Sequence, residues 1–380
     1  MPIVDALLRA LSFAFGMAWE ITWALILGFL LSAAVQAVIS KAEMTRLLPD
    51  ASPRHLALAT ALGAASSSCS YAAVALARSI FRKGADFTAA MAFEIASTNL
   101  VIELGIILAL LIGWQFTLGE FVGGAVMIVL LAILFRRFLR PSLVDEARQQ
   151  ADRGLRGSME GHAEMDMSVT EGPVLRRIAS PAGFTSISHY FVMDWVSVWK
   201  DIAAGILISG ALAVWVPRDW WTTFFLNSHP ALATYWGPIV GPLIAIVSFV
   251  CSVGNVPLAA VLWNGGISFG GVIAFIFADL IVLPILNIYR KYYGWRMMWL
   301  ILTTFYVAMA GAALIVELVF QRLGLIPSHG GAIVAHTTIT LNYTTVLNVI
   351  FLVIAALLVR RFLKTGGPHM IRMMDHPMAA

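Results

Sequence analysis

The chain has very little charge for its length. Only 12% of its 380 residues are Asp, Glu, Lys or Arg, whereas 60% are hydrophobic and the mean hydropathy is +0.85. A water-soluble protein of this size cannot cover its surface with so few charged groups. The composition therefore excludes a soluble fold and predicts an all-α polytopic membrane protein.

Thiols are also scarce, because the sequence holds two cysteines, Cys69 and Cys251. Two sulfurs cannot build a disulfide framework or a closed structural zinc site. The nucleotide-binding pattern Gly-x-x-x-x-Gly-Lys-Ser/Thr is missing too, so an ATP-driven pump would need a partner subunit. We expect no cofactor, no resident metal, no nucleic-acid partner and no enzymatic activity. The Met- and His-containing stretches 162–167 and 370–378 resemble low-complexity tails, and we expect no high-affinity metal site there.

Long apolar stretches are abundant, and a helix needs roughly 20 residues to cross the hydrocarbon core. Two further stretches, 56–81 and 237–263, are long enough but are interrupted by small, hydroxyl-bearing or Gly/Pro residues, which favours broken helices. Residues 1–20 and 183–200 predict interfacial helices. The predicted spans are 21–40, 87–113, 118–136, 201–217, 268–289, 297–320 and 342–359.

The sequence is internally duplicated. Shifting it by 182 positions superimposes Ser66, Cys69 and Ser70 on Ser248, Cys251 and Ser252. If 56–81 and 237–263 are re-entrant hairpins, all Lys and Arg except Arg9, Arg218 and Arg322 share one side, which the positive-inside rule makes cytoplasmic. Each copy then has three spans, so the repeats are inverted. The predicted parts are repeat 1 (1–138), a cytoplasmic linker (139–182), repeat 2 (183–322), and an extra span with a cytoplasmic tail (323–380).

Inverted repeats place a substrate site at their interface near the midplane, where both hairpin tips meet. Cys69 and Cys251 sit at those tips, and a pair of thiols suits a thiophilic solute. A half-helix starting near Pro257 would point its positive end at the same place. The other predicted substrate-binding residues are Ser68, Ser70, Ser252 and Asn255.

Ionisable side chains inside predicted spans are costly, and they mark functional positions by default. Glu94 and Asp279 are candidates for a proton relay, with a hydrogen-bonded structural role as the alternative. For Glu103 we favour a structural role, and Asn99 places an amide side chain near these acids.

Five motifs stand out in the sequence, namely Ser67–Ser70, Glu94–Leu100, Phe249–Gly271, Ala278–Leu280 and Tyr289–Trp295. They resemble motifs of the bacterial predicted permease family that includes the organoarsenical efflux permeases. For its characterised members the resemblance implies export of trivalent organic arsenicals such as methylarsenite, with thiols implicated. Carried to this chain, it gives Cys69 and Cys251 the substrate role.

Together these features predict a secondary-active permease of the bacterial inner membrane, with the linker and C-terminus cytoplasmic, that exports a thiophilic solute. Uptake of a reduced sulfur compound or a soft metal ion is the alternative, as is a membrane thiol redox enzyme or sensor. The expected partners are the solute and membrane lipids. A homo-oligomer is compatible with the sequence.

Overall fold

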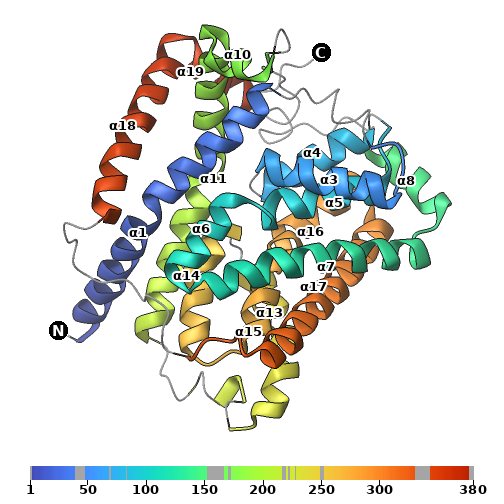
Figure 1. Ribbon diagram of the computed structural model, residues 1–380, viewed down its shortest axis with the longest axis vertical. Coiled ribbons are helices and arrows are strands. Elements are labelled where there is room, and N and C mark those ends of the chain that lie inside the picture. Colours follow the sequence, from blue (N-terminus) through green and yellow to red (C-terminus); the bar gives the residue numbers. More distant parts are fainter. Residues whose placement is uncertain are drawn as a thin grey trace.

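The computed structural model describes residues 2–38, 48–67, 70–82, 84–151, 167–169, 173–215, 220, 223–226, 228–248, 252–329 and 343–375. Within these ranges every regular element is helical (Figure 1). Prolines begin several helices, as expected where the first amide has no partner within the helix; they include Pro53, Pro141, Pro181 and Pro230.

The membrane spans agree with the prediction. Six of the seven predicted spans coincide with helices that are long and apolar enough to cross a membrane. The seventh, 201–217, falls on the C-terminal part of α11 (Pro181–Trp215). The chain is thus a polytopic all-α membrane protein. The helices long and apolar enough to cross are Ile21–Val38, Phe87–Leu111, Trp114–Phe138, Trp295–Leu323 and Thr344–Lys364, with Phe269–Ile281 and Leu283–Tyr293 as a sixth, bent by 42°.

Helix bounds repeat along the chain with the offset of 182. Helix α4 (Ser70–Arg82) corresponds to α14 (Ser252–Asn264), and α5 (Phe87–Asn99) corresponds to α15 (Phe269–Phe277) continued by the 3₁₀ helix η1 (Ala278–Ile281). The same side-chain cap opens both α5 and α15: Asp86 accepts from Ala89 N, and Ser268 accepts from Gly271 N. The remaining pairs are α1 (Pro2–Val38) with α11, α3 (Pro53–Ser66) with α13 (Pro230–Ser248), α6 (Ile102–Leu111) with α16 (Leu283–Tyr293), and α7 (Trp114–Phe138) with α17 (Trp295–Leu323).

Both interrupted stretches fold back as helical hairpins. In the first, Leu48 O before α3 accepts from Asp86 N after α4 at 3.1 Å, so the chain enters and leaves the hairpin at one end. In the second, a Cβ added to Gly237 would lie 3.1 Å from Gly271 Cα, which sets the beginnings of α13 and α15 side by side. Figure 1 shows α3–α5 in the upper half of the view and α13 and α15 in the lower half. Both stretches thus fold back on themselves, whereas their re-entry into a membrane and their sidedness stay predictions.

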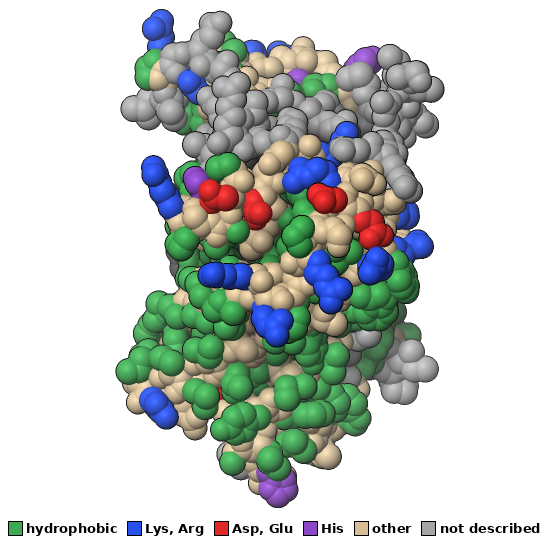
Figure 2. Space-filling view, turned by 90° about the vertical axis from the view of Figure 1, so that its right-hand side faces the viewer, with side chains coloured by type: hydrophobic (Ala, Val, Ile, Leu, Met, Phe, Trp, Pro, Cys, Tyr) green, Lys and Arg blue, Asp and Glu red, His purple; other side chains and the backbone are tan. Residues whose placement is uncertain are grey.

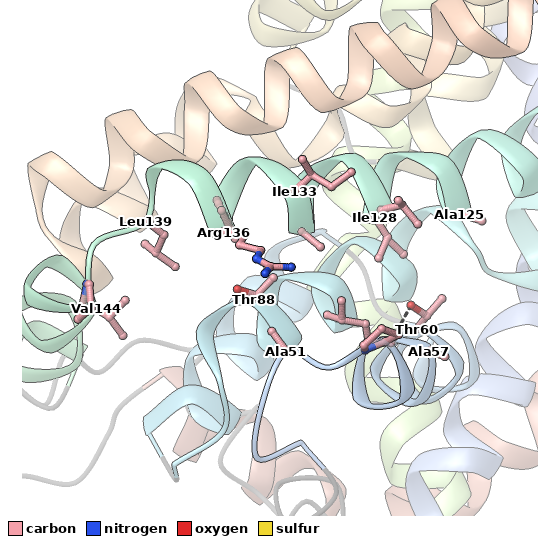
Figure 3. Close-up of a pocket in the computed structure, with 16 residues that line it drawn as sticks. Ala51, Ala57, Thr60, Thr88, Ala125, Ile128, Ile133, Arg136, Leu139 and Val144 are labelled. Atoms are coloured by element: carbon pink, nitrogen blue, oxygen red, sulfur yellow. Dashed lines mark hydrogen bonds between the residues drawn. The ribbon is translucent and has the colours of Figure 1, made fainter.

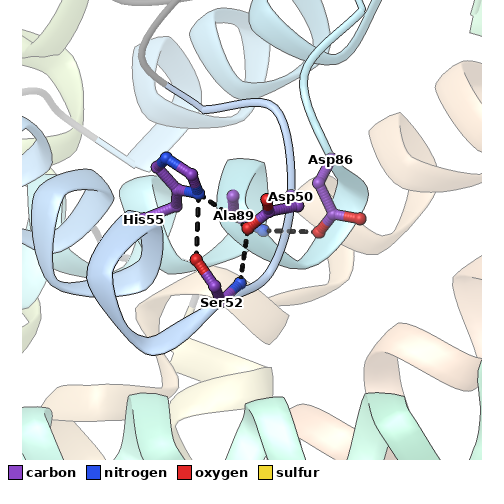
Figure 4. Close-up of polar contacts among 5 residues, drawn as sticks. All are labelled: Asp50, Ser52, His55, Asp86 and Ala89. Atoms are coloured by element: carbon purple, nitrogen blue, oxygen red, sulfur yellow. Dashed lines mark hydrogen bonds and ion pairs between the residues drawn. The ribbon is translucent and has the colours of Figure 1, made fainter.

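A short polar cluster holds the chain where it enters the first hairpin (Figure 4). Asp50 Oδ1 and Ser52 Oγ both contact His55 Nδ1, at 2.6 and 2.9 Å. The bond with His55, followed by those with Ser52, lowers the pKa of Asp50 from 3.8 to about 2. A nucleophile relay needs the acid and the hydroxyl on opposite ring nitrogens, so this Ser-His-Asp group at the start of α3 is not arranged as a catalytic triad.

The predicted interfacial helices are corrected by the structure. Residues 2–38 form one uninterrupted helix, and 181–215 form another, because no proline interrupts either after its first residue. Each predicted interfacial segment therefore continues directly into its span. The two helices pack along their length, with Gly210 against Ala14 at one end and Phe29 against Trp195 toward the other. In Figure 1 α1 ascends from the N-terminus while α11 descends, so they run antiparallel, as inverted repeats require.

Two spans predicted as continuous are broken instead. Helix α5 ends at Asn99 and α6 begins at Ile102, whereas η1 ends at Ile281 and α16 begins at Leu283. Pro284 in the first turn of α16 explains the second break, because its ring cannot continue the preceding helix. The second hairpin is also corrected: α14 starts at Ser252, so Pro257 lies inside this helix and not at its start.

The predicted linker contains ordered helices that sequence composition did not indicate. Helix α8 (Pro141–Ala151) packs against α4, α16 and α17. Buried Arg78 of α4 donates to Ala151 O at 2.6 Å, and Arg148 of α8 donates back to Phe81 O and to Ala85 O. These reciprocal bonds fix α8 over the open end of the first hairpin. Helix α10 (Val174–Ala179) leads into α11.

The last span lies outside the duplication, as predicted. Helix α18 (Tyr343–Lys364) packs on α1 and α11 and continues into α19 (Gly367–Asp375). Its buried Asn348 accepts from Trp23 N at 2.8 Å and donates to Trp19 O at 2.7 Å. Figure 2 shows Lys and Arg side chains gathered in a band on one face, between acidic groups above and a largely hydrophobic surface below, as expected at a membrane boundary.

Candidate functional site

The tip of the first hairpin meets the broken span of the second repeat. Ser70, the first residue of α4, is wholly buried and donates to Asp279 Oδ2 at 2.6 Å. Asp279 lies in η1, immediately before the break in its span. A residue predicted for substrate binding and one predicted for proton coupling are thus in direct contact, although 209 positions separate them.

The second candidate acid is also held across the two repeats. Glu94 of α5 is wholly buried and accepts a hydrogen bond from the hydroxyl of Tyr289 on α16. Its other oxygen, Oε2, has no hydrogen-bond partner among the described residues. Asp279 lies within electrostatic range of Glu94, so Ser70, Asp279, Glu94 and Tyr289 form one buried polar group between the repeats.

Sequence reasoning missed a third acid of this group. Glu120 of α7 is wholly buried, neither of its carboxylate oxygens has a partner among the described residues, and Asp279 is its electrostatic neighbour. Close packing of Gly119 on Phe269 and of Gly123 on Phe277 presses this part of α7 against α15. The signal was available, because Glu120 lies inside the predicted span 118–136. We call Glu94, Glu120 and Asp279 the acid cluster.

Two amides that sequence analysis singled out are buried near breaks. Asn255 lies in the first turns of α14, and neither its Oδ1 nor its Nδ2 has a partner within the described ranges. Asn99 ends α5 and donates to Thr98 Oγ1 at 3.1 Å, while its own Oδ1 has no described partner. An amide buried without a partner is costly, so both mark positions where a polar ligand or water would be stabilising.

Glu103 lies against α1, and its role stays a prediction. A Cβ added to Gly28 of α1 would lie 2.2 Å from Glu103 Cβ, so this acid packs directly on α1. Its electrostatic neighbour is Asp194 of α11. A second buried acid that sequence analysis overlooked, Glu317 of α17, accepts from Gly270 N and so stabilises the start of α15.

The structure does not test the predicted substrate-binding role of the two thiols. Cys69, Cys251 and Ser68 lie outside the described residues, and of Ser252 only its place at the start of α14 is described. Residues 162–166 and 376–378 lie outside them as well. Over the described ranges no group of three or more His, Cys, Asp or Glu side chains is arranged to hold a metal ion.

The arrangement defines a class of protein. Three of its features are typical of a membrane transport protein. They are the helical hairpins that fold back on themselves, the spans broken at polar residues, and the buried acid cluster between the two repeats. The comparisons with known proteins agree. Residues 6–318 match the family described as "Predicted permease", and the chain belongs to this family.

Two relatives show how far the likeness extends. A Mycobacterium tuberculosis protein named "Putative permease Rv2963" is 65% identical over 338 residues, which are 89% of this chain and 83% of that protein. The Escherichia coli "UPF0718 protein YraQ" is 26% identical over 98 residues, about a quarter of each chain. No solved structure matches the chain significantly. The family membership that the motifs indicated is confirmed.

Proposed function

We propose that this permease is a secondary-active exporter of thiophilic solutes, with trivalent organoarsenicals such as methylarsenite as the substrate class. In this proposal Cys69 and Cys251 bind the solute and the acid cluster carries the protons that drive its export. The protein would work in a bacterial inner membrane, with the linker and the C-terminus cytoplasmic. The observation that carries the proposal is the contact between Ser70 and Asp279, since it joins the chain neighbour of Cys69 to a buried acid.

The chemistry of binding supports a separate proton site. Methylarsenite carries two hydroxyl groups on arsenic, and exchange with two thiols forms two As–S bonds and releases two waters. Two S–H and two As–O bonds break, so no net proton is taken up or released. Binding by the cysteines alone therefore cannot couple transport to a proton gradient. Carboxyl groups that gain and lose protons next to the binding site would supply the coupling.

Replacing the cysteines tests the proposal. Cys69→Ser and Cys251→Ser keep the side-chain size but replace a soft donor with a hard one. We expect each variant to lose at least about tenfold in affinity for methylarsenite, with unchanged yield and thermal stability. Measurements in everted membrane vesicles and in cells would compare uptake and resistance. Ser66→Ala is a control, because the Ser66 hydroxyl bonds Gly63 O within its own helix.

Full transport and full resistance in both serine variants would contradict thiol binding. Transport that persists in the opposite direction with thiosulfate as solute would favour sulfur uptake. A reversible disulfide between the two cysteines, with no net flux of any solute, would favour the redox alternative.

A further inference from the structure

An apolar groove of about 840 Å³ is lined by residues of α3, α5, α7 and α8, and no member of the acid cluster is among them (Figure 3). One wall is α7 and the other is α3 of the first hairpin, with Thr88 of α5 at the base and the start of α8 at one end. Val129 and Ile133 on its rim are 58% and 59% exposed within a membrane span, so they face lipid. The groove thus opens toward the bilayer and not toward water.

One charged side chain lines this groove. Arg136 lies in the last turn of α7 and points into the groove toward Thr88 (Figure 3). No hydrogen bond or ion pair joins its guanidinium to another side chain of the described residues. Helix α7 has 25 residues and is therefore about 37 Å long, which exceeds a hydrocarbon core of about 30 Å. The helix is therefore long enough for its last turn to lie at the depth of the lipid phosphates.

A second groove provides a contrast. It has a volume of about 690 Å³ and lies between α7, α8 and α17. It is lined by two cations, Arg140 and Arg296, and Arg296 contacts Glu146 Oε2 at 3.4 Å, so part of the positive charge of this groove is already balanced by the protein. Arg137, next to Arg136 in sequence, lies over the ring of Phe138 at 5.6 Å. Of these cations, Arg136 is the one that combines an apolar channel with a charge left for an external anion.

We propose that the α3–α7 groove is a binding site for an anionic phospholipid. The acyl chain would lie along the apolar walls, and the phosphate would pair with Arg136. An amphiphile with one negative end and one apolar tail complements a channel with one cation at headgroup depth. Because α3 forms one wall, the bound lipid also contacts the first hairpin.

Lipid binding to the full chain tests the proposal. Protein purified in neutral detergent is titrated with phosphatidylglycerol and, separately, with phosphatidylcholine, and bound lipid is counted by native mass spectrometry. We expect phosphatidylglycerol to bind and phosphatidylcholine to bind at least about tenfold more weakly. Arg136→Gln should remove this preference, whereas Arg137→Gln and Arg296→Gln should keep it. Equal binding of both lipids, or an unchanged preference in Arg136→Gln, would overturn the proposal.

A second variant tests the channel independently of the charge. Ala132→Phe places a ring in the groove while Arg136 stays intact, so phosphatidylglycerol binding should also fall about tenfold. Retained binding in this variant would mean that only the headgroup is bound, which contradicts an acyl-chain site. Inorganic phosphate is the remaining arm. If it competes at the same concentration as the lipid, the site recognises free phosphate and the lipid assignment is wrong.

Discussion

The two repeats share one backbone frame but carry different polar side chains. Helix bounds follow the offset of 182 to within about five residues, and both copies make a similar hairpin and a similar broken span. The acids do not repeat. In the opposite copy Glu94 is matched by Ile276, Glu120 by Leu302 and Asp279 by Ser97. Packing thus preserves the frame, whereas the polar site is built from unequal contributions of the two copies.

The buried polar group depends on contact between the two copies. Repeat 1 supplies Glu94 and Glu120, and repeat 2 supplies Asp279 and Tyr289, so the polar group is complete only when the copies meet. Many transporter folds are built from repeats that place a substrate site at their interface. The side chains that line such a site need not follow the symmetry of the backbone.

The largest expected effect comes from neutralising the two acids that bond across the repeats. Glu94→Gln and Asp279→Asn keep size and hydrogen bonding but cannot titrate, so each should abolish gradient-driven transport while methylarsenite binding persists. Flux into everted vesicles and equilibrium binding would be measured on the same preparations. Ser97→Ala removes the counterpart of Asp279 in the other repeat, a hydroxyl that bonds Glu94 O, and should keep most of the transport.

Unchanged gradient-driven flux in both acid variants would remove them from the coupling path. Loss of binding and folding together would assign them a structural role instead.

Glu120 is an acid with no polar counterpart in the other repeat, because Leu302 takes the equivalent position. Glu120→Gln should slow gradient-driven transport by about tenfold or more and shift its dependence on pH. Glu317→Gln is the matched control, since Glu317 already accepts from Gly270 N and should affect stability and not the pH profile. A wild-type pH profile in Glu120→Gln would exclude this acid from the cluster's function.

The shared frame depends on small residues at equivalent helix contacts. A Cβ added to Gly63 of α3 would lie 2.3 Å from Phe93 O, and one added to Gly241 of α13 would lie 2.4 Å from Gly271 O. Gly63→Ala and Gly241→Ala should each destabilise the protein by about 1–3 kcal/mol. Thermal unfolding in detergent measures this effect. Gly311→Ala, whose added Cβ would meet Leu130 at an ordinary 3.4 Å, should unfold like the wild type; equal stability of all three variants would contradict the close packing.

The smallest effect concerns the C-terminal helices outside the duplication. His189 of α11 precedes the predicted span, and its ring contacts Thr365 Oγ1 at 2.7 Å and Met370 Sδ at 3.0 Å. Burial, followed by the charge of Arg361, lowers its pKa below 6.5. The undocked state therefore binds the proton more readily, so docking of α19 is strongest above pH 6.5 and weakens as the pH falls below it.

Limited proteolysis of α19 at pH 7.5 and pH 5.5 would measure this change. We expect about a twofold faster cleavage at the lower pH in wild type and no pH dependence beyond that of the protease in His189→Gln. The same acceleration in both proteins would contradict the role of His189.

Sequence alone predicted most of the frame, because the duplication and the apolar stretches directly express membrane packing. It also predicted Ser70, Glu94 and Asp279 as site residues, although it could not show that Ser70 and Asp279 touch. Continuous α1 and α11 were missed because the charges of residues 1–20 resemble an interfacial helix. The break after Asn99 was missed because neither glycine nor proline marks it. Glu120 was overlooked, although the rule that identified Glu94 applies to it equally.

Insertion of the two repeats in opposite directions is tested most directly by labelling equivalent positions. Arg82 ends α4 and Asn264 ends α14, 182 positions later. Arg82→Cys and Asn264→Cys are each made in a chain that carries Cys69→Ser and Cys251→Ser, and an impermeant thiol reagent is applied to intact cells and to everted vesicles. We expect labelling of Arg82→Cys only in everted vesicles and of Asn264→Cys only in intact cells. Labelling of both from the same side would contradict insertion in opposite directions.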